Sequence, residues 1–194
     1  AEFEHDYTED HKAKAEQTAI YDADYSARTY GTGGLLPRFL DHTRGTGHHS
    51  PMYVYRWDET RSLLEKFRDH DGSKWDAISL EYRDPTTGRT AYPTMTFFGQ
   101  LLRPGEKTLP QKQNASLVCI AFEGAGKTTV DGQIFEWKPF DAIAVPGGTW
   151  FHHENASDKD DAILFVTSDE PTLKALGFHR RQGRTEDGTI IRLD

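Results

Sequence analysis

Four residues in the second half of the chain have types and a spacing that could build a polar pocket. Gln111 and Gln113 are separated by one residue, and so are Phe151 and His153. Because side chains alternate along a β-strand, each pair shares one face, and all four point inward if Phe151 does. Such a pocket could hold water, a small acid or, weakly, a metal ion. The alternative is a group of hydrogen-bonded side chains without a ligand.

The segments that must position these residues are short strands separated by turn signals. The sequence predicts strands near 94 to 102, 116 to 122, 126 to 130, 133 to 137, 141 to 145, 149 to 154 and 161 to 167. Asp131-Gly132 supplies the positive φ of a tight hairpin between two of them. Regular short strands of this kind indicate a β-sandwich or barrel.

The frame of glycines and prolines around the four residues resembles a cupin, a small antiparallel jelly-roll barrel. Its frame residues are Gly105, Gly124, Pro146, Gly148 and Asn155. Laid on this chain, the cupin metal-ligand positions fall on Gln111, Gln113, Leu117 and Phe151. An amide is a poor iron ligand beside imidazole, and phenylalanine cannot bind a metal at all. The resemblance predicts an all-β cupin double-stranded β-helix with a few short helices at either end, and no metal in this barrel.

A longer resemblance covers roughly residues 50 to 183 and is strongest from residue 82. It is carried by Ser168-Asp169-Glu170-Pro171, by the run Ala-Leu-Gly-Phe-His-Arg at 175 to 180, and by residues 82 to 88, 92 to 94, 122 to 126, 130 to 132 and 145 to 146. These segments are similar to the C-terminal end of gentisate 1,2-dioxygenases and of salicylate and 1-hydroxy-2-naphthoate dioxygenases. The resemblance implies a bicupin, whose ferrous iron is held by three histidines in the N-terminal barrel. This chain resembles the C-terminal half.

That resemblance implies a function for the complete enzyme. It would open the aromatic ring of a hydroxybenzoate with O2 and Fe(II), and this chain would have a structural role. The implied partners are the N-terminal catalytic cupin, other subunits of a homo-oligomer and the aromatic acid substrate. Whether this chain alone is active stays open. The alternatives are a stand-alone monocupin that binds a small aromatic acid, and a metalloenzyme that uses His153 with the two glutamines.

The order of segments predicts four regions. Residues 1 to 50 form a polar linker or arm, 51 to 92 a helix plus a leading strand packed on the barrel, 93 to 183 the cupin barrel, and 184 to 194 a C-terminal tail. We expect a helix over 59 to 68 with Asp58 as its N-cap and with Leu63, Leu64 and Phe67 on its apolar side. The leading strand is expected over 75 to 82, and Gly177 should end a second helix.

Composition narrows the partners and the compartment. The net charge is −8 and no basic stripe is present, which argues against nucleic acid. No apolar run is long enough to span a membrane.

The single cysteine, Cys119, lies mid-strand and predicts a buried thiol in a reducing, cytoplasmic compartment. The strand 117 to 122 is apolar on both faces, so we expect the arm or a second barrel to cover its outer face. The chain begins at Ala1, and whether it is a fragment stays open.

Overall fold

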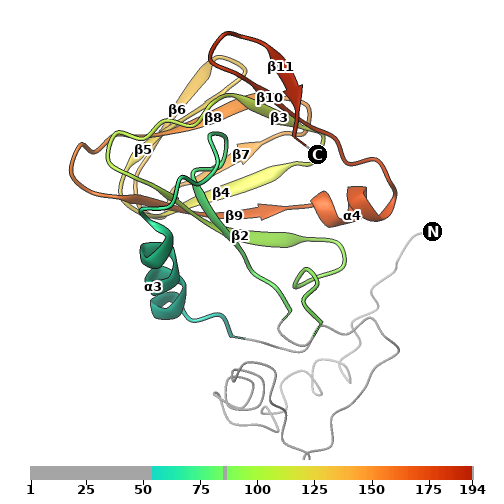
Figure 1. The fold of residues 1–194 in the computed structure, drawn as a ribbon, viewed down its shortest axis with the longest axis horizontal. Helices are drawn as coiled ribbons and strands as arrows, with labels where there is room; N and C mark the ends of the chain where they lie inside the picture. The colour runs from blue at the N-terminus through green and yellow to red at the C-terminus, as the bar shows by residue number, and fades with distance from the viewer. Residues whose placement is uncertain (1–53, 85–86, 194) are drawn as a thin grey trace, which may run out of the picture.

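The computed structural model describes residues 54–84 and 87–193, and the predicted arm at 1 to 50 lies outside them. Two helices and a set of short strands make up the described part (Figure 1). The helices are α3 (Trp57–Phe67) and α4 (Glu170–Ala175). The strands are β1 (Ile78–Glu81), β2 (Thr96–Leu102), β3 (Gln111–Gln113), β4 (Leu117–Glu123), β5 (Gly126–Val130), β6 (Gln133–Trp137), β7 (Ala142–Val145), β8 (Trp150–Asn155), β9 (Ala162–Ser168), β10 (Arg181–Arg184) and β11 (Ile190–Arg192).

The strands form two antiparallel sheets that face each other. The first sheet has the order β1-β2-β9-β4-β7, and the second has the order β11-β10-β3-β8-β5-β6. The main core lies between them and includes Leu102, Cys119, Trp137 and Leu164, each at most 3% exposed. This arrangement confirms the predicted all-β class and jelly-roll barrel. Cys119 is buried and free, as predicted.

The turns explain why the strand positions were predictable. Asp131 and Gly132 have φ of 44° and 84°, and they join β5 to β6 as the predicted tight hairpin. The start of β1 was predicted less well, because the sequence favoured a strand from Trp75. In the structure Ser73 and Ala77 instead exchange backbone hydrogen bonds across a tight turn, and Ala77 has a positive φ of 52°.

Helix α3 lies on the outer face of the first sheet (Figure 1). Its N-cap is Arg56, not Asp58, which lies in the first turn. Leu64 is fully buried against Ile78, Leu101 and Ile163. The prediction that Leu63 and Phe67 share this burial was wrong, since they are 43% and 44% exposed. The buried stripe of the helix is narrow and consists of Thr60 and Leu64, so Leu63 and Phe67 fall outside it.

The outer face of β4 is only partly covered within the described residues. Val118 and Phe122 are 40% and 38% exposed, whereas Cys119 and Ala121 on the inner face are fully buried. The ring centroid of Phe122 lies 4.3 Å from that of Trp57 in α3. The two-sided apolarity of this strand therefore leaves exposed apolar surface beyond the helix, and the expected cover by the arm or a second barrel stays a prediction.

The C-terminal segment is a hairpin, where the sequence predicted a tail from residue 184. Strand β10 pairs with β3 on one side and with β11 on the other. The carboxylate of Asp187 accepts hydrogen bonds from Oγ1 of Thr185 and from the backbone N–H of Thr189, and these bonds hold the turn between the two strands. The guanidinium of Arg184 lies 4.5 Å above the ring of Trp150 in β8. Strand β10 is polar and β11 has only three residues, so neither gives a periodic signal, which is why the sequence did not predict this hairpin.

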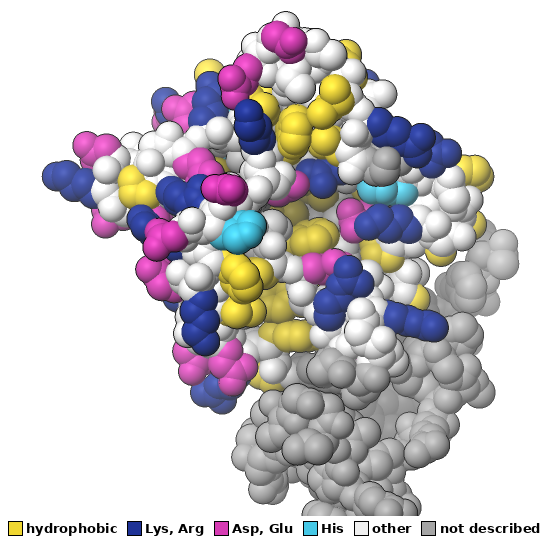
Figure 2. Space-filling view, viewed as in Figure 1, with side chains coloured by type: hydrophobic (Ala, Val, Ile, Leu, Met, Phe, Trp, Pro, Cys, Tyr) yellow, Lys and Arg dark blue, Asp and Glu magenta, His cyan; other side chains and the backbone are white. Residues whose placement is uncertain are grey.

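The end of α4, the lengths of the two described helices and the surface charge can each be compared with what the sequence predicted. Helix α4 ends as predicted near Gly177, whose φ is 73°. Neither helix described here has the length and apolarity that crossing a bilayer requires. Figure 2 shows acidic and basic side chains interspersed over the visible face, without a large patch of one sign.

Candidate functional site

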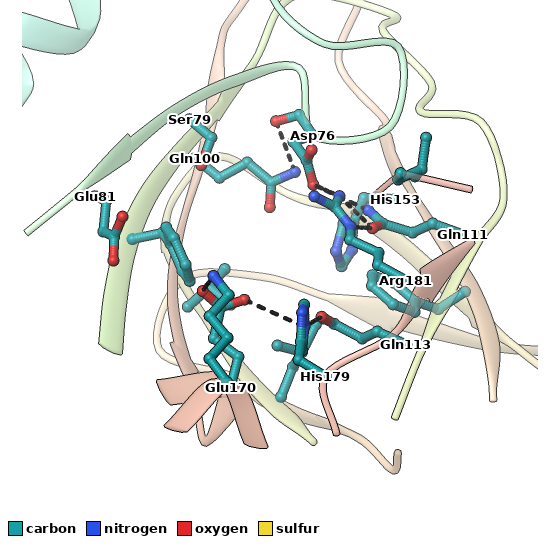
Figure 3. A pocket seen from close by; sticks show the side chains of 16 residues that line it. Asp76, Ser79, Glu81, Gln100, Gln111, Gln113, His153, Glu170, His179 and Arg181 are labelled. Carbon is teal, nitrogen blue, oxygen red and sulfur yellow. Dashed lines mark hydrogen bonds and ion pairs between the residues drawn. The ribbon is translucent and has the colours of Figure 1, made fainter. Parts of the chain in front are cut away.

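The structure brings the four predicted pocket residues together in one cavity. The cavity measures about 330 Å³ and lies between the two sheets (Figure 3). Gln111 and Gln113 reach it from β3, and Phe151 and His153 reach it from β8. Its wall also contains polar residues that the sequence did not predict: Asp76, Ser79, Glu81, Gln100, Glu170, Lys174, His179 and Arg181.

Strand register explains why the predicted residues meet. Gln111 in β3 is the direct antiparallel partner of Phe151 in β8, so both side chains point to the same side of the sheet. Thr128 in β5 is the partner of His153 in the same way. Inward-facing residues of β3 and β8 thus form one wall of the cavity, and Thr128 of β5 contacts His153 without lining the cavity itself.

His153 is 1% exposed and belongs to a buried hydrogen-bond chain. Its Nδ1 lies 2.9 Å from Oγ1 of Thr128, which accepts a hydrogen bond from Nε1 of Trp137 at 3.0 Å. The arrangement that satisfies every donor has Thr128 donating to Nδ1, so the ring proton of His153 is on Nε2. Burial lowers the pKa of His153 to about 4, and the ring is therefore neutral at pH 7.

The side chain of Gln111, one of the two predicted glutamines, is bound by Arg181. Nε of Arg181 donates to Oε1 of Gln111 at 2.9 Å, and its guanidinium also forms an ion pair with Asp76. Nε2 of Gln111 donates to the backbone oxygen of Trp75 at 2.7 Å and to Oδ1 of Asp76 at 3.1 Å. Burial raises the pKa of the Asp76 carboxyl, but the charge and hydrogen bond of Arg181, together with hydrogen bonds from Gln111 and Ser73, outweigh burial and leave that pKa below its usual value.

A second polar group lies at the side of the cavity formed by α4 and the residues that follow it (Figure 3). Nζ of Lys174 forms an ion pair with Oε1 of Glu170 at 2.6 Å. Nε2 of His179 lies 3.8 Å from Oε2 of Glu170 and 3.4 Å from Oε1 of Gln113. Gln113 is therefore linked to α4, whereas Gln111 is linked to the turn before β1.

These residues do not fit the three-histidine iron site of the resembled enzymes. The matching positions supply two amides and a phenyl ring, and the oxygen of one amide already accepts from a guanidinium. A divalent cation beside Gln111 would be repelled by Arg181. Within the described ranges, no group of three or more His, Cys, Asp and Glu side chains is arranged to hold a metal ion.

Sequence reasoning missed the charged half of the site for a physical reason. Asp76 lies in an irregular turn, and Arg181 lies on a polar strand that follows the last strand predicted from the sequence, 161 to 167. Neither position carries a motif, and their pairing spans a large distance in the chain. The signal that could have found them is the pair of inward-facing glutamines, because buried amides need hydrogen-bond partners from elsewhere in the fold.

Comparison with known proteins gives consistent matches. The family model described as "Cupin domain" matches residues 100–168. A 5-aminosalicylate 1,2-dioxygenase of Comamonas sp. is 34% identical over 140 residues, which cover 71% of this chain and 37% of the relative. A gentisate 1,2-dioxygenase of Aquipseudomonas alcaligenes is 33% identical over 137 residues, which cover 69% of this chain and 38% of the relative.

Solved structures agree with these matches. The crystal structure of salicylate 1,2-dioxygenase from Pseudoaminobacter salicylatoxidans with gentisate superposes with a TM-score of 0.70 at 27% identity, and the match covers 84% of this chain and 44% of that chain. This chain thus spans less than half the length of the relatives that it matches.

Proposed function

Because this chain carries a cupin domain and is related to the ring-cleaving gentisate and salicylate 1,2-dioxygenases, we propose that it is the metal-free C-terminal cupin of an enzyme of that kind. The complete enzyme would open the aromatic ring of a hydroxybenzoate with O2. Its Fe(II) would be held in an N-terminal barrel. A cytoplasmic location remains a prediction that rests on the single, unpaired cysteine.

One observation carries the proposal that this barrel works without metal. The cation inside the barrel is the guanidinium of Arg181, which binds both Gln111 and Asp76. These hydrogen bonds hold β10, β3 and the turn before β1 together, which is a structural role. The arginine, which is paired with Asp76, thus places its guanidinium beside Gln111, one of the positions where a cupin enzyme would bind its metal.

We also propose that the exposed apolar face of the first sheet contacts the N-terminal barrel or another subunit. Val118 and Phe122 of β4 are well exposed on the outer face, and Phe140, which follows β6, is 79% exposed. The ring of Phe140 lies 6.3 Å from that of Phe122. An apolar surface of this kind suits contact with the catalytic barrel or with another subunit.

Metal analysis tests the proposal. The purified chain would be loaded with Fe(II) without oxygen, desalted and analysed for iron. We expect far less than one iron per chain. The matched comparison is the longer gene product that also contains the upstream barrel, which should carry about one iron and open gentisate or salicylate. Iron at one equivalent in this chain alone would contradict the proposal, and so would a gene without an upstream cupin.

One substitution in the longer protein tests whether Arg181 stabilises the fold or takes part in iron binding and turnover. Arg181→Met should lower its stability while the iron content and the turnover per iron stay near those of the parent. The neighbouring Arg184→Met, which removes a surface contact with Trp150, is the matched control. A loss of iron in Arg181→Met without a loss of stability would assign the arginine to the metal site instead.

A further inference from the structure

Three polar groups that face the cavity lack hydrogen-bond partners among the residues that the structure describes. Nε2 of His153 makes no hydrogen bond to any residue that the structure describes, although the side chain is 1% exposed. The same holds, within these ranges, for Nε2 of Gln113, whose Oε1 faces His179. Gln100 donates from Nε2 to the backbone oxygen of Asp76 at 3.0 Å, and its Oε1 accepts from no described residue. Two donors and one acceptor thus remain for a ligand.

The space between these groups is apolar. Phe98, Leu117, Phe151 and Val166 line the same cavity. Phe151 is 2% exposed and lies edge to face with His153, with ring centroids 5.6 Å apart. A cavity of about 330 Å³ is at the small end of the range for ligand pockets and suits a single ring. An apolar body with polar groups at its edge would match this lining.

The charges around the cavity are already balanced. Its three carboxylates are Asp76, Glu81 and Glu170. Their ion-pair partners are Arg181, Arg83 and Lys174, respectively. A ligand carboxylate would have to compete with one of these acidic side chains for its cation, and the displaced carboxylate would stay partly buried without a partner. The cavity therefore disfavours an anionic ligand, including the small aromatic acid that the sequence suggested.

We propose that this cavity binds a small uncharged molecule with one apolar ring and two hydroxyl groups. One hydroxyl oxygen would accept from Nε2 of His153 and the other from Nε2 of Gln113, and a hydroxyl proton would be donated to Oε1 of Gln100. The ring would lie between Phe98 and Phe151. The inference stands apart from the proposed function, because it concerns occupation of this barrel and holds whether or not an upstream barrel carries iron.

Calorimetric titration of the full 194-residue chain with resorcinol tests the inference. Resorcinol should bind with one site per chain. The matched acid, 3-hydroxybenzoate, keeps one hydroxyl and replaces the other with a carboxylate, and it should bind at least about tenfold more weakly. Toluene has the ring without hydroxyl groups and should also bind more weakly than resorcinol, because the three polar groups would lose their hydration without gaining partners.

Substitutions at the polar groups locate the site. Gln113→Met keeps the length of the side chain and removes one donor, so we expect resorcinol affinity to fall about five- to tenfold. Gln100→Leu removes the acceptor and should have an effect of similar size, and it decides the matter if the first variant does not fold. Gln133→Met changes an exposed glutamine on β6 outside the cavity and should leave the affinity unchanged.

Three outcomes would overturn the inference. They are the absence of saturable resorcinol binding, tighter binding of 3-hydroxybenzoate than of resorcinol, and unchanged affinity in both cavity variants. None of these outcomes alters the iron content of the chain, so the proposed function and this inference can fail separately.

Discussion

Arg181 and Gln111 are joined by a hydrogen bond of 2.9 Å from Nε to Oε1, although Arg181 is the register partner of Gln113 and not of Gln111. The arginine side chain therefore runs diagonally along β3 toward the turn that contains Asp76. The guanidinium thus binds two segments that are far apart in the sequence, β3 through Gln111 and the turn before β1 through Asp76.

Arg181→Met should destabilise the chain by about 2 to 3 kcal/mol at pH 7. The substitution leaves the Asp76 carboxylate without its cation, and loss of one partner of a fully buried pair costs about 3–5 kcal/mol. The smaller value applies because the two side chains are 23% and 29% exposed. Urea unfolding measures the change. The double variant Arg181→Met/Asp76→Asn should be more stable than the single variant, and an equal or lower stability would contradict the argument.

The same pair predicts how stability depends on pH. Asp76 has a pKa below its usual value, so it stabilises the fold above about pH 4, and this contribution is lost as pH falls through the folded pKa. In Arg181→Met the charge and hydrogen bond of the guanidinium no longer lower the pKa of Asp76, and burial, which raises that pKa, is opposed only by the hydrogen bonds from Gln111 and Ser73. The difference in stability between parent and variant should therefore be largest near pH 7 and shrink toward pH 4. A constant difference across unfolding curves from pH 7 to pH 4 would show that Asp76 is not the group involved.

His153 should make the fold sensitive to mild acid. Its pKa is lowered from 6.5 to about 4, so the unfolded chain binds a proton at this residue before the folded chain does. Its contribution is fully present above pH 6.5 and declines as pH falls toward 4, by up to about 3 kcal/mol. His153→Leu should be less stable at pH 7 but should show a flatter pH dependence in urea unfolding. His152→Leu, on the opposite face of β8, is the control and should keep most of the slope.

Gly183→Ala should weaken the attachment of the C-terminal hairpin. A Cβ at this position would lie 2.4 Å from Nε1 of Trp75, which is closer than atoms can approach. The hairpin or the indole must move, and overpacking of this kind costs about 1–3 kcal/mol. At the control position Gly99, a Cβ would have its nearest contact at 3.4 Å, with a methyl group of Thr60. A thermal melt of Gly99→Ala should show the smaller loss, and the reverse order would argue against the packing seen at Trp75.

The barrel and its inward-facing residues could be predicted from the sequence, but the residues that bind Gln111 could not. The predicted strands match β4 through β9 closely, because hairpin glycines and short apolar runs mark them locally. Strand alternation was enough to place Gln111 and His153 on one inner surface. Arg181 and Asp76 depend on how distant segments pack, and no local pattern in the sequence encodes that contact.

The helix shows the same limit. Its existence followed from composition, whereas its buried side depended on the sheet beneath it. Leu64 is fully buried against that sheet, whereas Leu63 is 43% exposed, although both are leucines on adjacent positions. The N-cap position also moved by two residues, from Asp58 to Arg56, since acidic residues are favourable both at the cap and within the first turn.

Strand β9 lies between β2 and β4 and pairs with both, yet it follows both along the chain. The first sheet therefore cannot form from sequence-adjacent strands alone. Its β2 and β4 strands are joined only when β9, which comes later in the chain, pairs with both. Non-local pairing of this kind gives slow folding and leaves unpaired strand edges exposed in the meantime. The apolar strand β4 has one such unpaired edge until β9 pairs with it, so the chain is most prone to aggregate before β9 is in place.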